Sequence, residues 1–319
     1  MKNNKVEKQP EHGVLNFSHR HELMEAIERR HEIPHKFAYF GNGANVWDAI
    51  SKDGHYDLGK RELSTLKRFL ELASVNLEKK PFNILHIAPG NGIEVPIIIN
   101  TLGINRIGHC ALIDISQEML KITNSYVKKR FRNLDFLSFV CDVTKPDISN
   151  TIKNLRRNDI CRNIILLIAN GAILSNSQVL SYIRKAMTSE DRLFVTLEVY
   201  SASREKKIIE QYKLPSIIEL FAKSLALIGI HDVSSEQFEF LYNKKHSMIE
   251  VYFLAKKWLE LHSNVELNLE IPLPERIKIF SSFRPTPSKL REFLINNRFK
   301  VIIFHFFKKE QCCGCLCTV

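Results

Sequence analysis

The chain has 319 residues, and its 46 basic and 35 acidic side chains give a formal net charge of +11. Hydrophobic residues make up 45% and charged residues 25% of it, which excludes a disordered protein and indicates one large or two modest globular domains. No apolar run reaches the roughly 18 residues of a membrane span, and residues 1–10 lack the apolar segment of a signal peptide. We therefore expect a cytoplasmic protein.

Apolar runs alternate with helical patterns in the first two thirds of the chain. Apolar residues at spacings of three and four predict helices, which we expect over 61–77, 93–102, 117–131 and 177–187, with Ser116 as the N-cap of the third. Strands are expected over 82–87, 110–113, 136–141, 163–169 and 193–199. Nearly continuous apolar strands separated by helices predict an α/β fold, a doubly wound Rossmann-like parallel sheet covered on both faces.

The chain after residue 200 is less regular. Residues 205–230 predict a helix, and the runs 238–242 and 248–255 predict a hairpin. Thr286 and Pro287 suit the N-cap and first position of a helix that precedes a last strand over 299–307. We expect a segment 1–60 and an insertion 201–290 that together form a mixed α+β substrate lobe, a core over 61–200 and 291–309, and a Cys-rich tail over 310–319.

The seven cysteines fall into two groups. Cys110, Cys141 and Cys161 lie in or beside apolar runs and are expected to be reduced and buried. Four more lie at 312, 313, 315 and 317. No second ligand pair accompanies their C-x-x-C spacing, so we expect no metal, and Leu316 occupies the position that prenylation requires for Cys. The tail is either a frayed end without function, which we favour, or an S-acylated anchor for peripheral membrane contact.

Glycines and acids follow the first three predicted strands. Gly90 and Gly92 follow the first strand, Asp114 ends the second, and Asp142 follows the third. Ligands of doubly wound sheets bind at such strand ends, where an acid accepts ribose hydroxyls or an adenine amine. Val95 replaces the third glycine of a dinucleotide fingerprint, and no P-loop motif is present. The pattern therefore favours S-adenosylmethionine (SAM) as the cofactor.

The segment 36–62 resembles the N-terminal part of the ergothioneine-pathway histidine Nα-methyltransferases. Their pattern is roughly K-Y-F-Y-D-x-x-G-S-x-L-F-[DE]-x-I, followed by Y-Y-x-T-R-x-E. The matching residues are Lys36, Tyr39, Gly43, Trp47, Asp48, Ile50, Tyr56 and Glu62, and later Tyr212, Phe221, Phe238, Glu239, Ile249, Glu250, Ser282 and Thr286. The resemblance covers about residues 30–307 and implies a class I SAM-dependent methyltransferase fold.

The resemblance also implies site residues. Substrate contacts fall on Tyr39, Tyr56, Asn170, Tyr212, Phe280 and Ser282, with Tyr39 also the catalytic candidate. Cofactor contacts fall on His86, Gly90, Gly92, Asp114 and Asp142.

Several positions depart from the family pattern. His86 replaces the acid that ends the first strand, and Ala88 replaces the next glycine. The substrate-holding asparagine aligns with Ile173 without gaps, although Asn170 is near. Phe280 replaces the glutamate that reads the imidazole ring. Since a polar site disfavours ligands that leave its groups unpaired, this replacement predicts an apolar or aromatic substrate group rather than histidine.

We expect a monomeric SAM-dependent N-methyltransferase for the amine of a small molecule or amino acid. One alternative is a degenerate methyltransferase fold that serves as a binding or membrane-tethered interaction module. A nucleic-acid methyltransferase ranks third. Basic residues cluster at 128–130 and 156–157, but the other charges are interspersed along the chain, which favours a solvated surface over a nucleic-acid partner.

Overall fold

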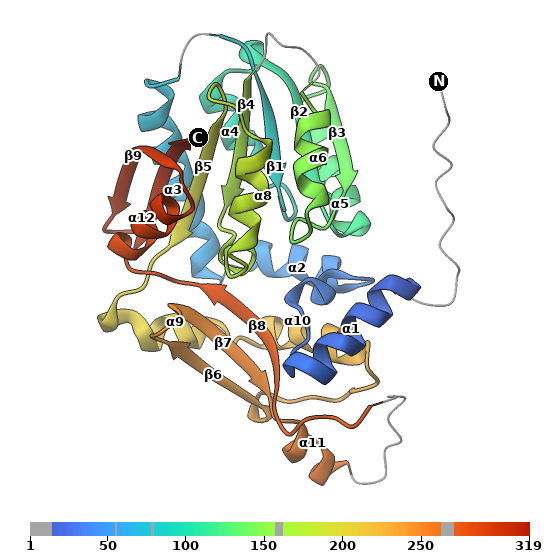
Figure 1. Cartoon of the computed structure of the whole chain (residues 1–319). Helices are drawn as coiled ribbons and strands as arrows, with labels where there is room; N and C mark the ends of the chain where they lie inside the picture. Colours follow the sequence, from blue (N-terminus) through green and yellow to red (C-terminus); the bar gives the residue numbers. More distant parts are fainter. Residues whose placement is uncertain (1–14, 55, 78–79, 157–161, 263–270) are drawn as a thin grey trace.

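Two β-sheets organise the molecule. The computed structural model describes residues 15–54, 56–77, 80–156, 162–262 and 271–319. The large sheet contains β1 (Phe82–Ile87), β2 (Ile107–Asp114), β3 (Phe136–Val140), β4 (Arg162–Ile168), β5 (Arg192–Glu198), β9 (Lys300–Phe307) and β10 (Cys312–Thr318). The small sheet contains β6 (Phe238–Asn243), β7 (Met248–Phe253) and β8 (Ile277–Phe283). The strand orders are β3-β2-β1-β4-β5-β10-β9 and β6-β7-β8 (Figure 1).

The large sheet confirms the predicted doubly wound α/β core. Strands β1 to β5 pair in parallel. One face packs against α3 (Asp57–Ser74), α4 (Val95–Leu102) and α5 (Gln117–Lys128). The other face packs against α6 (Asp147–Asn154), α8 (Gln178–Ala186) and α12 (Pro287–Asn296). The predicted N-caps are confirmed, since Ser116 and Thr286 accept hydrogen bonds from the backbone N–H groups of Met119 and Lys289.

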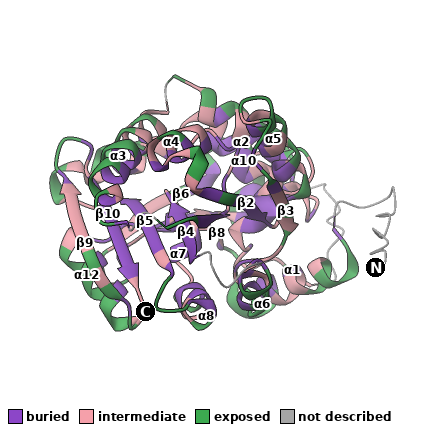
Figure 2. Cartoon of the chain, turned by 90° about the horizontal axis from the view of Figure 1, so that it is seen from above, coloured by how far each residue is buried: buried purple, intermediate pink, exposed green. Residues whose placement is uncertain are grey.

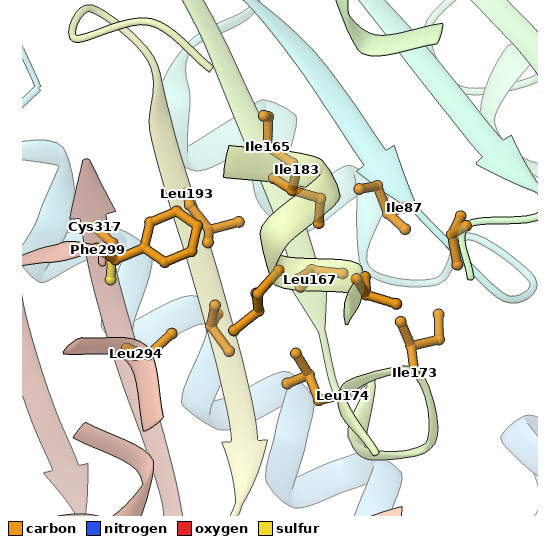
Figure 3. Close-up of a cluster of buried hydrophobic side chains, with 14 of the residues drawn as sticks. Ile87, Ile165, Leu167, Ile173, Leu174, Ile183, Leu193, Leu294, Phe299 and Cys317 are labelled. Atoms are coloured by element: carbon orange, nitrogen blue, oxygen red, sulfur yellow. The ribbon is translucent and has the colours of Figure 1, made fainter. Parts of the chain in front are cut away.

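The sequence-based separation of a tail at 310–319 is corrected by β10. This strand pairs antiparallel with both β5 and β9 and lies buried between them (Figure 2). Its residues alternate between the two faces: Leu316 belongs to the α3 side, and Cys317 lies beside Phe299 on the α12 side (Figure 3). The segment escapes prediction because cysteine and glycine are not the residues that mark a strand.

The cysteines of β10 have no exposure to solvent. Their relative exposure is 0%, so these four thiols are not accessible for the S-acylation that a membrane anchor would require. Cys110 is also buried, and Cys141 is half-buried; Cys161 lies outside the described residues. In the part of the chain that the structure describes, no helix is long and apolar enough to cross a membrane.

A smaller lobe lies at the carboxyl ends of the parallel strands (Figure 1). Its core contains the small sheet and residues of α1 (Phe17–Arg30), η1 (His35–Tyr39), α2 (Gly43–Lys52), α9 (Glu205–Gln211), α10 (Pro215–Ala226) and α11 (Ala255–Leu261). The predicted hairpin is confirmed as β6 and β7. The helix expected over 205–230 is instead two helices, because Pro215 begins a new one.

A buried carboxylate joins the lobe to the core. Glu198, the last residue of β5, is fully buried and binds two guanidinium groups. Arg61 of α3 donates to it at 2.6 Å, and Arg284, which follows β8, donates at 3.2 Å. Strand β8, helix α3 and strand β5 therefore meet at one ionic contact.

Replacing Gly314 with alanine tests the packing of β10. An ideal Cβ at Gly314 would lie 2.3 Å from Cγ of Phe69 in α3, so the core would have to shift. We expect a loss of about 1–3 kcal/mol in the free energy of unfolding, measured by urea denaturation. Gly54→Ala is the control, because no atom lies within 4 Å of its ideal Cβ. Equal stability of both variants would contradict the packing of β10 on α3.

Candidate active site

A cavity opens at the carboxyl ends of the parallel strands. Residues of η1, α2 and α3 line it together with the loops that follow β1, β2, β3 and β4. We call it the strand-end cavity. Its lining includes Glu62, Gly90, Glu94, Asp114 and Asp142.

The loop after β1 is held against α2. Gly90 and Gly92 have φ angles of +54° and +78°, values that glycine adopts without strain. Gly90 lines the cavity. Gly92 does not, which corrects its expected role as a cofactor contact, because it packs against Thr123 of α5. Asn91 donates to Asp48 at 2.8 Å and to Ser51 at 2.7 Å. The N-terminal segment thus closes over the loop that we expect to carry the cofactor.

Asp114 ends β2 and faces the cavity. One carboxylate oxygen accepts the backbone N–H of Ser116 at 2.9 Å, and burial raises the pKa of the group to about 7. The Ser116 hydroxyl donates to the Tyr39 carbonyl, which ties η1 to the start of α5. Asp114 is therefore a fixed acceptor at the position expected for ribose hydroxyls.

Asp142 lines the same cavity but already has protein partners. Lys36 donates to one oxygen at 2.5 Å, and Thr144 donates to the other through both its hydroxyl and its N–H. Lys36 is itself buried and also pairs with Glu22 at 2.6 Å. Burial alone would raise the pKa of Asp142, but the Lys36 ammonium and the Thr144 bonds lower it. Asp142 is therefore ionised, lines the cavity and keeps further capacity to accept hydrogen bonds.

His86 does not line the cavity, which corrects its expected role as a cofactor contact. Alternation along β1 puts it on the same face as Phe82 and Ile84, which packs against α3 and α4. Its Nδ1 has no hydrogen-bond partner among the described residues, and burial lowers its pKa to about 3. His86 is a neutral core residue.

Two glutamates that the sequence did not single out as site residues line the cavity. Glu62 comes from α3, and Glu94 immediately precedes α4. Oε1 of Glu62 and Oε2 of Glu94 are buried without a hydrogen-bond partner in the described chain. Burial raises the pKa of Glu62 to about 8 and that of Glu94 to about 7.

A second cavity lies in the lobe beside the first. All six predicted substrate residues line it: Tyr39, Tyr56, Asn170, Tyr212, Phe280 and Ser282. We call it the lobe cavity. The ring of Phe280 lies 5.4 Å, centroid to centroid, from the rings of both Tyr212 and Phe221. The described residues that line this cavity include no aspartate or glutamate.

The two cavities share a wall. The residues that line both are Tyr39, Trp47, Tyr56, Leu58, Ala169, Asn170, Ala172 and Arg284. Trp47 lies edge-on to both tyrosines, at 6.0 Å between centroids. Asn170, which follows β4, donates to the Ile87 carbonyl at 3.0 Å. Ile173 lines only the strand-end cavity, so Asn170 has the better position for a substrate contact.

The phenols of the two cavities lie near one cation: Tyr39, Tyr56 and Arg284 belong to the shared wall, and Tyr212 lines only the lobe cavity. Burial raises the pKa of Tyr39, Tyr56 and Tyr212. Arg284 donates to the Tyr212 hydroxyl at 3.0 Å and to Glu198. A tyrosine with a raised pKa is a hydrogen-bonding group rather than a base at neutral pH.

Comparison with known proteins gives matches to methyltransferases. A family model described as "Histidine-specific methyltransferase, SAM-dependent" matches residues 19–318. No curated protein matches the chain. Among solved structures, the magnesium protoporphyrin IX methyltransferase of Synechocystis PCC 6803 is 9% identical, with a TM-score of 0.48 over 94% of this chain and 99% of that chain. A methyltransferase of Clostridium acetobutylicum is 10% identical, with a TM-score of 0.45 over 80% and 91%.

The unpartnered Glu62 predicts a pH effect on stability. The pKa of Glu62 rises from 4.5 to about 8 on folding. Between pH 4.5 and about pH 8, the carboxyl group is therefore protonated in the folded chain and ionised in the unfolded chain. Stability therefore falls as pH rises through this range, by at most about 1.4 kcal/mol per pH unit. We expect Glu62→Gln to weaken this fall between pH 6.5 and 8.5 in denaturation experiments. Glu71→Gln, at an exposed position of α3, is the control. An unchanged slope in the Glu62 variant would refute a buried proton there.

Proposed function

Because the chain belongs to the histidine-specific, SAM-dependent methyltransferase family, we propose that it methylates the amine of a small molecule that carries an apolar or aromatic group, in preference to histidine. The family and its cofactor follow from a match over residues 19–318. The acceptor is our inference from the lobe cavity.

The apolar lining of the lobe cavity carries this proposal. Phe280, Phe221 and Tyr212 form an aromatic cluster in it, and no carboxylate accompanies them among the described lining residues. An imidazole there would leave its N–H without an acidic partner, and an apolar group would lose nothing. The lining therefore supports an apolar or aromatic acceptor.

The shared wall supports direct transfer between the two cavities. Bound SAM supplies an electrophilic methyl group on its sulfonium sulfur. Trp47, Tyr39 and Tyr56 exclude water from the wall and position the acceptor. Positioning of the two reactants is the main contribution of the protein to a direct transfer. Arg284 disfavours an ammonium ion beside it, so it favours the neutral amine that attacks.

Arg284 also suits an acceptor with a carboxylate. A guanidinium has five N–H groups. The Phe283 carbonyl, the Tyr212 hydroxyl and Glu198 account for three of them. An amino acid would place its carboxylate near Arg284 and Asn170 and its side chain against Phe280. We assign this role to the lobe formed by the N-terminal segment and residues 201–290.

Asp114→Asn tests the cofactor site. Loss of the charged acceptor should weaken binding of S-adenosylhomocysteine (SAH) about tenfold to a hundredfold in isothermal titration calorimetry. Asp147→Asn, at an exposed position of α6, should leave binding unchanged. Unaltered affinity in the Asp114 variant would refute its contact with the cofactor.

A substrate panel tests the acceptor. The protein and SAM are incubated with histidine and with amino acids and amines that carry aromatic or branched aliphatic groups, and methylated products are measured by mass spectrometry. We expect kcat/KM for the best apolar acceptor to exceed that for histidine at least about tenfold. Phe280→Glu should shift the ratio toward histidine by about tenfold, whereas Phe280→Leu should preserve it. Preference of the unaltered protein for histidine would overturn the proposal.

A further inference from the structure

The strand-end cavity contains two carboxyl groups, those of Glu62 and Glu94, each with one buried oxygen that has no hydrogen-bond partner in the described chain. Glu62 is 7% exposed, and the unpartnered oxygens of Glu62 and Glu94 are both buried. The described chain places no salt bridge on either group: the nearby guanidinium of Arg61 is bound to Glu198, and so is that of Arg284. Burial of a carboxylate without a partner raises the free energy of the folded state. A cationic or hydrogen-bonding ligand would therefore bind favourably to the two glutamates.

The sheet order places these groups away from the adenosine end. Asp142 follows β3 and Asp114 ends β2, and both strands lie on one side of β1. Glu62 comes from α3, which packs on β5 and β10 at the other side, and Glu94 follows the glycine loop of β1. The shared wall, which includes Tyr39 and Trp47, separates the strand-end cavity from the lobe cavity. We place this wall between the two aspartates and the two glutamates.

The two glutamates do not reach the acceptor. Neither Glu62 nor Glu94 lines the lobe cavity, so neither is in position to take a proton from an amine bound there. The residue in the family's position for an acid at the end of β1, His86, is buried in the core and lines neither cavity. The chain thus lacks an acid at that position and has two elsewhere on the same cavity.

We propose that Glu62 and Glu94 bind the α-ammonium group of the methionine part of SAM. The proposal rests on the assignment of SAM as cofactor. Adenosine, sulfonium and amino-acid tail then lie along one cavity, at Asp114, at the shared wall and at the glutamate pair respectively. Binding of the ammonium gives each carboxylate a charged partner and offsets the cost of its burial. Burial raises the pKa of both groups, and a bound ammonium would lower it again by stabilising the charged form.

The experiment compares ligands that differ only in the tail. Calorimetry measures binding of SAH, of its analogue without the α-amino group, and of 5′-methylthioadenosine, which lacks the whole tail. We expect Glu62→Gln and Glu94→Gln each to weaken SAH binding about tenfold or more. Binding of the other two ligands should change less than about threefold, because they carry no ammonium. The loss of SAH affinity divided by the loss of affinity for the desamino analogue measures the contact between the glutamate and the ammonium group, as in a double-mutant cycle.

The controls separate this inference from its premise. Glu71→Gln on the same helix should bind all three ligands as the unaltered protein does. Unchanged methylthioadenosine binding shows that a variant has kept a folded cavity. Equal losses for SAH and its desamino analogue, or no loss for either, would overturn the assignment of the two glutamates. Failure of the unaltered protein to bind SAH would overturn the cofactor assignment itself.

Discussion

The contact of Glu198 with Arg61 and Arg284 is the constraint on which the site depends. It joins the end of a core strand to a core helix and to the end of the lobe sheet. Breaking a buried ion pair by removing one partner costs about 3–5 kcal/mol, so the lobe is not free to move away from the strand ends. Because Arg284 lines both cavities, the same contact that orients the lobe also sets the charge at the wall between cofactor and acceptor.

Much of the fold was predictable because most residues of β1, β2, β4 and β5 are buried on both faces of the sheet. Strands β1 to β5 are nearly continuous apolar runs, and that pattern identifies the Rossmann-like core. Strand β10 is different. Gly314 leaves room for the Phe69 ring, and small cysteines pack on the opposite face. The residue types that fit in β10 therefore depend on neighbours that are distant in sequence. The break at Pro215 was visible in the sequence, but the helical periodicity on both sides concealed it.

The site was predictable where topology alone creates it. Asp114 and Asp142 lie at the carboxyl ends of the adjacent strands β2 and β3, so the sheet order alone places them near each other. The family resemblance supplied Tyr39, Tyr56 and Tyr212. The prediction for His86 was wrong because it depended on the position of this residue beside the glycine loop. The alternation of side chains along β1 points His86 into the core instead. Glu62 and Glu94 share no local pattern: they become neighbours of one cavity only after α3 and α4 pack together.

The position of β10 has a consequence for synthesis of the chain. Its partner Glu198 leaves the ribosome about 110 residues before Cys312, which at usual elongation rates is roughly 5–20 s. Throughout that interval β5 has an unpaired apolar edge, the kind of surface that recruits other chains. Residues 201–290 of the lobe are made during the same interval, so this edge is still unpaired while the lobe is synthesised. The large sheet is therefore complete only when the last residues of the described chain have been made.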